Sequence, residues 1–382
     1  MPIYLDNAAS SFPKPESVYR AVDKTLRSAG NPGRGGHGMT IAAGRLIFET
    51  RELLGALFGA PDSARIAFTS NATEAINTAL FGLLLPGDRV VTSTMEHNAV
   101  TRPLRVLEGR GVTVVKVPAD RTGFVDPEEI RRACAEKTRM VVLSHCSNVT
   151  GTLQAVEEIG PWCRKEGILF LLDAAQSAGV FPVDVEAMGI DLLAVPGHKG
   201  LLGPQGTGAL YVREGLELTP LMYGGTGGHS ASDLPPETMP ERLEAGTLNT
   251  PGLAGLRAGV EFLLGEGIDA VRSREAELLR RLIDGLGQIA GVTLYGPLDP
   301  GRHGGALSLD IEGVDPSEAG FRLEREHGIL CRVGMHCAPD AHRTIGTFPR
   351  GTVRLSPGYF TTGEEIDRAL TGLAALARSK AS

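Results

Sequence analysis

A lysine and an aspartate each stand at the end of a short apolar run in this chain of 382 residues. Lys199 lies between the run 190–195 and a glycine-rich turn, and Asp173 ends the run 168–173. This context is typical of side chains presented at the ends of buried strands. A lysine that can form a Schiff base and a carboxylate that can hold a pyridinium nitrogen together indicate a cofactor site.

The elements that must position these residues are short strands that alternate with helical patterns from about residue 50 to 215. Several runs are apolar at consecutive positions, which is typical of parallel strands covered on both faces. We therefore predict an α/β fold with a mostly parallel seven-stranded sheet and helices on both faces, with ligands bound beyond the carboxyl ends of the strands. The predicted strands are 65–69, 89–92, 112–117, 140–144, 168–173, 191–195 and 208–212, and the helices between them include 73–85, 126–135 and 155–166.

A candidate phosphate site follows the first predicted strand. Asn71 and Glu74, three residues apart, resemble a capping signature for the next helix. A helix N-terminus beyond a strand end binds anions readily, so the amides of Ala72 and Thr73 and the Thr73 hydroxyl could hold a phosphate. The alternative is a plain capped helix.

Further polar residues also follow predicted strands. His97 could stack on an aromatic cofactor or shuttle protons, or be a surface histidine. Asn148 could belong to an ordinary turn, and Asp173 could be a helix cap. Because the carboxyl ends of parallel strands share one edge, we expect these residues to converge with Thr73 and Lys199 on a single site.

The composition excludes several classes of function. The net charge of −7 and the aromatic content of 5% do not favour binding to nucleic acid or to an anionic membrane. No apolar run approaches the roughly 18 residues of a membrane span, and the first residues do not form a signal peptide. The five scattered cysteines fit neither a disulfide framework nor a zinc site, so we expect no metal and a reducing, cytoplasmic setting.

Residues 222–250 interrupt the α/β alternation with a long excursion rich in Gly, Pro, Ser and Thr. The remainder of the chain, from about 265, has the pattern of a smaller α+β domain. We predict a large cofactor-binding domain over 16–258, and a small domain formed by 1–15 and 259–382 that carries Cys337. The small domain is expected to have helices near 268–289 and 363–378 and strands near 305–311, 328–333 and 352–356.

An ordered set of motifs spreads over nearly the whole chain. Through it, residues 3 to 375 resemble the class V pyridoxal-phosphate enzymes, and within them the cysteine desulfurase and selenocysteine lyase group. The resemblance implies the type I fold of these enzymes and a homodimer. The motifs are Tyr4-Leu-Asp-Asn-Ala-Ala9, Asn71-Ala-Thr-Glu-Ala75, Met95-Glu-His97, Ser147-Asn-Val-Thr-Gly151, Asp173-Ala-Ala-Gln176, Gly197-His-Lys199, Glu244-Ala-Gly-Thr247 and Gly334-Met-His-Cys337.

The same resemblance implies residue roles around pyridoxal phosphate. Lys199 would form the Schiff base, Asp173 would pair with the pyridine nitrogen, and Gln176 would bond the phenolic oxygen. Thr247 would reach the phosphate of the partner subunit, so the site would be shared. The other implied roles are ring stacking by His97 and phosphate binding by Thr73 with Ala72 and by His198. Asn7 and His37 would contact the substrate, and Asn148 would contact both cofactor and substrate; for His37 a surface loop is the alternative.

Cys337 and Arg354 distinguish the reaction type. A thiolate is needed to attack sulfur, and Cys337 lies between glycine and proline in a segment that looks exposed. A buried, inert cysteine is the better interpretation for Cys134, Cys146 and Cys163. Arg354 is either an exposed strand residue or, as the family pattern favours, a clamp on the substrate carboxylate assisted by Asn148.

The resemblance thus implies a cysteine desulfurase that converts L-cysteine to alanine and leaves a persulfide on Cys337, for iron–sulfur cluster or other thio-cofactor synthesis. The short stretch between Cys337 and Arg354 resembles the group II enzymes, which often need a dedicated sulfur-acceptor protein. Selenocysteine lyase, class V aminotransferase and a non-catalytic sulfur-relay or cofactor-binding protein are the alternatives. Pro196 departs from the family, because many relatives have a phosphate-binding serine there.

Overall fold

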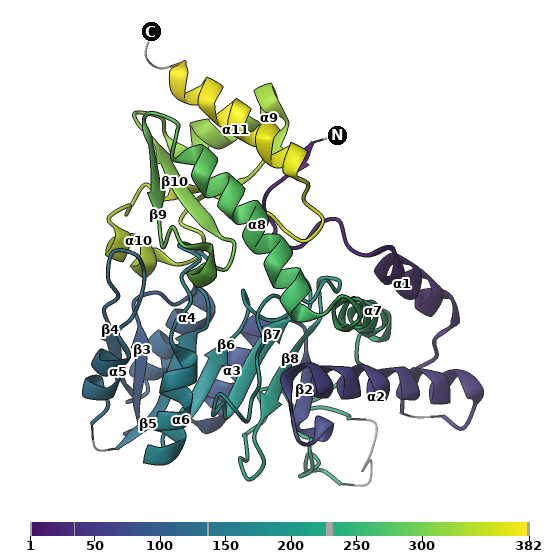
Figure 1. The fold of residues 1–382 in the computed structure, drawn as a ribbon. Helices are drawn as coiled ribbons and strands as arrows, with labels where there is room; N and C mark the ends of the chain where they lie inside the picture. Colours follow the sequence, from purple (N-terminus) through teal and green to yellow (C-terminus); the bar gives the residue numbers. More distant parts are fainter. Residues whose placement is uncertain (1, 34, 136, 227–231, 380–382) are drawn as a thin grey trace.

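The computed structural model describes residues 2–33, 35–135, 137–226 and 232–379 of the chain. Its centre is a seven-stranded sheet in the order β2-β8-β7-β6-β5-β3-β4, in which only β8 is antiparallel to its neighbours. The predicted α/β fold is therefore confirmed (Figure 1). Each predicted strand lies within three residues of its observed bounds. The strands are β2 (Ile66–Thr69), β3 (Arg89–Ser93), β4 (Thr113–Val117), β5 (Thr138–Ser144), β6 (Leu169–Asp173), β7 (Leu192–Pro196) and β8 (Gly208–Val212).

Side chains of the central strands pack alternately into two apolar cores, one on each face of the sheet. In β6, for example, Leu169 and Leu171 join one core while Phe170 and Leu172 join the other. This burial on both faces explains the uninterrupted apolar runs in the sequence. Helices α3 (Ala72–Leu83) and α4 (Asn98–Glu108) cover the first face; α2 (Gly38–Phe58), α5 (Pro127–Ala133), α6 (Val156–Glu166) and α7 (Thr250–Glu266) contribute to the core on the second.

The smaller part of the molecule has a four-stranded antiparallel sheet in the order β12-β13-β10-β9. The N-terminal strand β1 (Ile3–Tyr4) pairs with β11 (Ile329–Leu330), which ties the start of the chain to this part. Helix α8 (Ile268–Leu286) extends from α7 toward it (Figure 1). The other elements are β9 (Val292–Tyr295), β10 (Leu307–Ile311), α9 (Pro316–His327), β12 (Arg332–Gly334), α10 (Pro339–Ile345), β13 (Thr352–Leu355) and α11 (Gly363–Arg378).

A separate apolar core unites the N-terminal strand with the C-terminal third of the chain. It contains Ile3 and Leu5 together with buried residues from Leu278 to Leu376. On this basis we propose the division into a large domain over 16–258 and a small domain from 1–15 and 259–382.

Several elements were not predicted. Helix α1 (Glu16–Ser28) and α2 precede the first predicted strand, and both lie beside α7 at one end of the large sheet (Figure 1). Within the excursion 222–250, residues 227–231 lie outside the described part, and the remainder contains neither helix nor strand up to the first residue of α7, Thr250.

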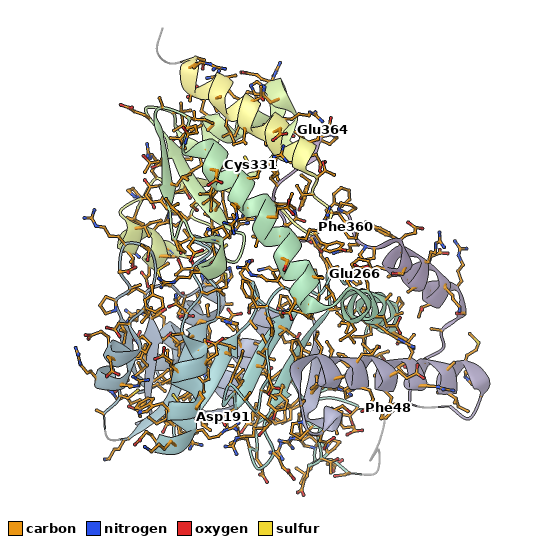
Figure 2. All side chains as sticks on the ribbon, viewed as in Figure 1. Phe48, Asp191, Glu266, Cys331, Phe360 and Glu364 are labelled. Carbon is orange, nitrogen blue, oxygen red and sulfur yellow. The ribbon has the colours of Figure 1, made fainter. Side chains whose placement is uncertain are left out.

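A partly buried ion pair, with Asp191 buried and Arg213 partly exposed, stabilises the end of the sheet far from the small domain, where Asp191 lies (Figure 2). The Asp191 carboxylate accepts a hydrogen bond from the Phe170 amide at 2.7 Å and pairs with Arg213. We expect Asp191→Ala to cost about 2–3 kcal/mol, because it leaves a buried amide and a cation without their partner. Thermal unfolding should show a lower melting temperature.

The control for this prediction is Asp23→Ala. Asp23 forms only an exposed helical ion pair with Arg27, which is worth about 0.5 kcal/mol at most. Equal melting temperatures for Asp191→Ala and Asp23→Ala would contradict a stabilising role for Asp191.

Candidate active site

A cavity of about 230 Å³ lies at the carboxyl ends of the parallel strands, where the large sheet meets the N-terminal segment and β12–β13. It brings together most of the residues singled out from the sequence. Asn7, His37 and Thr247 do not line it. The predicted residues that do are Ala72, Thr73, His97, Asn148, Asp173, Gln176, His198, Lys199, Cys337 and Arg354.

Asp173 and Lys199 reach this cavity from neighbouring strands of the sheet. Asp173 is the last residue of β6, is 4% exposed, and accepts a hydrogen bond from the Ala175 amide at 2.9 Å. Burial raises the pKa of Asp173. Burial also lowers the pKa of Lys199, in the turn after β7, to about 8, although the nearby Asp173 carboxylate opposes this shift. The site therefore offers an amine that is partly neutral near physiological pH beside a buried carboxylate.

This low pKa predicts how uptake of pyridoxal phosphate by the cofactor-free protein depends on pH. Only the neutral amine of Lys199 can attack an aldehyde, and it is the minor form below pH 8. The uptake rate should therefore rise about tenfold per pH unit up to about pH 8 and then level off. Stopped-flow absorbance measures this rate. A rate that continues to rise up to pH 10 would show an ordinary lysine pKa.

His97 presents a neutral ring to the cavity. It is the N-cap of α4, where its Nδ1 accepts a hydrogen bond from the Ala99 amide at 3.0 Å. Burial, with a smaller contribution from the charge of Lys199, lowers the pKa of His97 to about 4. An uncharged imidazole whose proton is on Nε2 is suited to lie against an aromatic ring.

The N-terminus of α3 forms one end of the cavity, which Ala72 and Thr73 line. The Asn71 side chain accepts from the Glu74 amide at 3.0 Å, and the Glu74 carboxylate accepts from the Ser70 amide at 2.7 Å. The capping prediction is thus confirmed, and helix geometry leaves the first-turn amides of Ala72 and Thr73 without partners inside the helix, so they could bind an anion. Nδ1 of His198 is buried without a hydrogen-bond partner and is available to the same anion.

These residues fit pyridoxal phosphate by their chemistry. The cavity has a helix N-terminus that could hold a phosphate at one end, a lysine with a lowered pKa, and a buried carboxylate. Pro196, the last residue of β7, also lines it. Because proline has neither a hydroxyl nor an amide hydrogen, the α3 N-terminus and His198 must hold a phosphate without help from position 196.

Cys337 is the exposed thiol of the chain, and it lines the cavity between β12 and α10. Both His336 and Cys337 have left-handed backbone angles, with φ of 46° and 59°. The other four thiols are less accessible. Burial raises the pKa of Cys134 to about 11 and the pKa values of Cys146 and Cys331 to about 12, and it raises that of Cys163 further.

Arg354 lies in β13 and is 2% exposed, so the interpretation of this residue as an exposed strand residue is wrong. Its guanidinium donates to the Asp6 carboxylate at 2.8 Å and to the Asn148 carbonyl at 2.9 Å. The alternating sequence around Arg354 gave no sign of this burial, because its partners are distant in the chain. The remaining N–H groups of Arg354 include a buried Nε without a partner.

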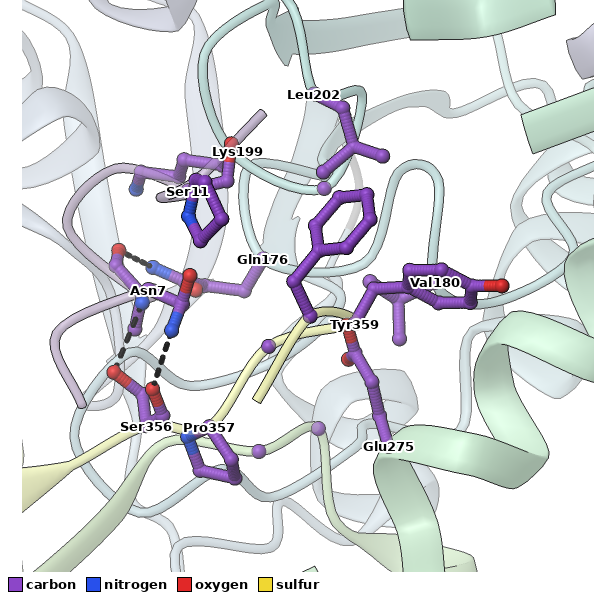
Figure 3. Close-up of a pocket in the computed structure, with 17 residues that line it drawn as sticks. Asn7, Ser11, Gln176, Val180, Lys199, Leu202, Glu275, Ser356, Pro357 and Tyr359 are labelled. Carbon is purple, nitrogen blue, oxygen red and sulfur yellow. Dashed lines mark hydrogen bonds between the residues drawn. The ribbon is translucent and has the colours of Figure 1, made fainter. Parts of the chain in front are cut away.

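Gln176 and Lys199 also line a second, smaller cavity of about 50 Å³, which includes Asn7 (Figure 3). Gln176 Nε2 donates to the Ala8 carbonyl at 3.0 Å. The Asn7 side chain donates to the Ser356 carbonyl at 3.0 Å and accepts from the Phe12 amide at 3.1 Å. The bond to Ser356 holds the N-terminal segment against the loop after β13, and the bond from the Phe12 amide lies within that segment, so the polar groups of Asn7 serve these contacts.

Thr247 and His37 lie elsewhere. Thr247 is exposed and lines a separate pocket of about 420 Å³ with Glu244 and Arg51, which form a buried ion pair at 2.7 Å. His37 is exposed at the N-cap of α2, with Nε2 3.2 Å from the Thr40 hydroxyl.

Glu96 is a buried residue near the site to which the sequence assigned no role. It is 1% exposed and accepts from the Ser93 hydroxyl at 2.5 Å and from the Ser144 amide and hydroxyl, each at 2.9 Å. Burial raises the pKa of Glu96 to about 7, and the charge of Asp173 adds to this. A glutamate next to His97 was the only sequence signal, and its partners come from other strands.

The described ranges contain neither a metal-binding cluster nor a helix that could span a membrane. No group of three or more His, Cys, Asp or Glu residues is arranged to hold a metal ion there. No helix of that part is long and apolar enough to cross a membrane.

A mostly parallel seven-stranded sheet with this site at its carboxyl edge defines the type I fold of pyridoxal-phosphate enzymes. Comparison with known proteins identifies the family. The chain belongs to the class-V aminotransferase family, whose model matches residues 3–369. The family resemblance inferred from the motifs and the prediction of an enzyme are therefore confirmed.

Relatives and solved structures agree with this assignment. A probable cysteine desulfurase of Methanothermobacter thermautotrophicus is 40% identical over 95% of this chain and 92% of its own length. The cysteine desulfurase IscS of Methanosarcina thermophila is 31% identical over 96% and 90%. The structure of an apo cysteine desulfurase from Thermococcus onnurineus NA1 covers 99% of this chain and 95% of its own, with a TM-score of 0.93 and 32% identity. The cysteine desulfurase CsdA of Escherichia coli gives the same coverages, with a TM-score of 0.89 and 30% identity.

Proposed function

We propose that this protein is a pyridoxal-phosphate-dependent cysteine desulfurase that transfers sulfur from L-cysteine to Cys337 and releases alanine. The observation that carries the proposal is the exposed Cys337 thiol, which lines the same cavity as Lys199 and Asp173. A class V aminotransferase would need the lysine and the aspartate but not this thiol. The names of the relatives and of the structural neighbours support the same function.

Pyridoxal phosphate, when bound, supplies an electron sink for the electrons released at the substrate carbon. Lys199 would hold it covalently, and Asp173 would keep its pyridine nitrogen protonated. The ring would lie against the neutral imidazole of His97, and Gln176 would bond its phenolic oxygen. The phosphate would bind to the N-terminus of α3, at Ala72 and Thr73, and to the unpartnered Nδ1 of His198.

The remaining residues act on the substrate. The free N–H groups of Arg354 would bind the carboxylate of L-cysteine, with Asn148 beside them. The Lys199 amine, whose pKa is about 8, can take and return the proton on the α carbon. The Cys337 thiolate forms a bond to the sulfur of L-cysteine as the carbon–sulfur bond breaks. Alanine and a Cys337 persulfide balance the reaction without an external reductant.

The active form is a homodimer with a shared site. Thr247 supports this, because it is exposed and lies outside the cavity of its own chain. Exposed apolar side chains on α2 and in the excursion near it would be covered by a partner. They are Met39, Ile41, Phe48, Met222 and Tyr223.

The persulfide would pass to a sulfur-acceptor protein for iron–sulfur cluster or other thio-cofactor synthesis. Accessible thiols of this kind persist in a reducing compartment, and all five cysteines are free, which supports a cytoplasmic location.

The test uses purified protein loaded with pyridoxal phosphate and incubated with L-cysteine. We expect the peptide that contains Cys337 to gain the mass of one sulfur atom, and one alanine to be released for each persulfide formed. Activity on L-selenocysteine without activity on L-cysteine would indicate a selenocysteine lyase, and dependence on a 2-oxo acid would indicate an aminotransferase. A protein that does not develop the yellow absorbance of bound cofactor would refute the proposal.

A further inference from the structure

The backbone that carries Cys337 is held in an uncommon conformation. His336 and Cys337 are consecutive non-glycine residues in the left-handed region, at φ of 46° and 59°. Such residues cost of the order of 1–3 kcal/mol each and persist only where the surroundings hold them. The turn between β12 and α10 must therefore be fixed by contacts outside itself.

The carbonyls of His336 and Cys337 both accept hydrogen bonds from the large domain. The His336 carbonyl accepts from the Asn148 side chain at 2.6 Å. The Cys337 carbonyl accepts from the amide of Asn98, the first residue of α4, at 2.8 Å. The thiol is thus carried on a backbone that is tied to two strand-end loops of the large sheet.

The His336 side chain extends this attachment through a buried chain of hydroxyl groups. Its Nε2 lies 3.0 Å from Thr352 Oγ1, which lies 3.0 Å from Ser308 Oγ, and Ser308 Oγ donates to the Val149 carbonyl at 2.7 Å. Thr352 and Ser308 are fully buried, and His336 is 5% exposed. Because Val149 follows Asn148, the chain of hydrogen bonds closes into a ring that begins and ends at His336.

The direction of donation along this ring is fixed. A carbonyl can only accept, so Ser308 gives its one hydrogen to Val149 and must accept from Thr352. Thr352 then has no second hydrogen and must accept from Nε2–H of His336. Nε2 of the imidazole therefore carries a proton. Nδ1 is buried without a partner, and burial lowers the pKa of His336 to about 2, so the ring is neutral with its one proton on Nε2.

We propose that His336, Thr352 and Ser308 are positioning residues, whose hydrogen-bond ring holds the left-handed backbone that presents the Cys337 thiol to the substrate sulfur. The inference rests on the proposed function, since only a sulfur-accepting Cys337 needs such placement. None of the three residues needs to touch the sulfur. Arg354 joins the same ring through the Asn148 carbonyl, so the carboxylate clamp and the thiol share one support.

The test compares Thr352→Val, which keeps the branched shape but removes the hydroxyl, with Thr352→Ser, which keeps the hydroxyl. Single-turnover persulfide formation on Cys337 should slow about 10–100-fold in Thr352→Val and recover in Thr352→Ser, because small displacements of a reacting atom have effects of this size. The rate of alkylation of Cys337 by iodoacetamide and the cofactor absorbance should change little. Amide hydrogen exchange over residues 334–339 should be faster in Thr352→Val.

The outcomes separate the possible roles. Persulfide formation at the wild-type rate in Thr352→Val, or equal losses in the Val and Ser variants, would overturn the proposal. A parallel loss of alkylation would also overturn it, because it would indicate an effect on thiol reactivity. If Thr352→Val does not fold, Ser308→Ala gives the same test. If the wild type forms no persulfide, the proposed function fails, and the presentation of the thiol to a substrate sulfur fails with it. Hydrogen exchange then decides only whether the ring holds the backbone: unchanged exchange in Thr352→Val overturns that as well.

Discussion

Replacing Lys199 with alanine should remove the yellow absorbance of covalently bound pyridoxal phosphate and lower alanine production from L-cysteine by at least about 10³-fold. Two functions are lost together, since the same amine would hold the cofactor and move the α proton. General acid–base catalysis alone contributes about 10²–10⁴-fold. Absorbance of the purified protein and an alanine assay measure the two effects separately.

Lys14 provides a matched control. Burial lowers the pKa of Lys14 to about 8, as it does for Lys199, and Lys14 donates to the Ser11 hydroxyl at 2.9 Å and to the His198 carbonyl at 3.4 Å. Lys14→Ala should keep the absorbance and the activity, because Lys14 does not line the main cavity. If Lys14→Ala were colourless and Lys199→Ala were yellow, Lys199 would be excluded as the residue that holds the cofactor.

Much of the large domain could be predicted from the sequence, because its signals are local. Strands buried on both faces appear as uninterrupted apolar runs, and parallel topology places their ends on one edge. The sequence alone therefore predicts that Asp173 and Lys199 lie at one site. Their strands β6 and β7 are neighbours in the sheet, which the structure shows directly.

The small domain and the support of the thiol were less predictable, since they depend on contacts between distant segments. Arg354 appeared exposed because its sequence alternates, yet Asp6, at the other end of the chain, neutralises it in a buried position. The position of Cys337 depends on Asn148, in a loop of the large domain. No periodicity or cap signals such pairings, so only the folded structure reveals them.

Replacing Cys337 with alanine should abolish the persulfide while leaving the cofactor absorbance intact. The thiol lines the cavity, but the anion site, Asp173 and Lys199 are complete without it. Alanine introduces no new backbone strain, since Cys337 is itself a residue with a side chain at φ of 59°. Intact-mass analysis after one turnover with L-cysteine should show no added sulfur, and alanine formation should fall to the background rate.

Cys331 is the control for this experiment, because it lies in the same segment. Burial raises the pKa of Cys331 to about 12, so this thiol is almost entirely protonated at neutral pH and cannot act as the nucleophile. Cys331→Ala should therefore form the persulfide normally. A persulfide retained in Cys337→Ala would assign sulfur transfer to another thiol. Cys146 also lines the cavity, but it is only 3% exposed and burial raises its pKa to about 12. Of the two thiols that line the cavity, only Cys337 is exposed, so the choice between a desulfurase and an aminotransferase depends on this residue.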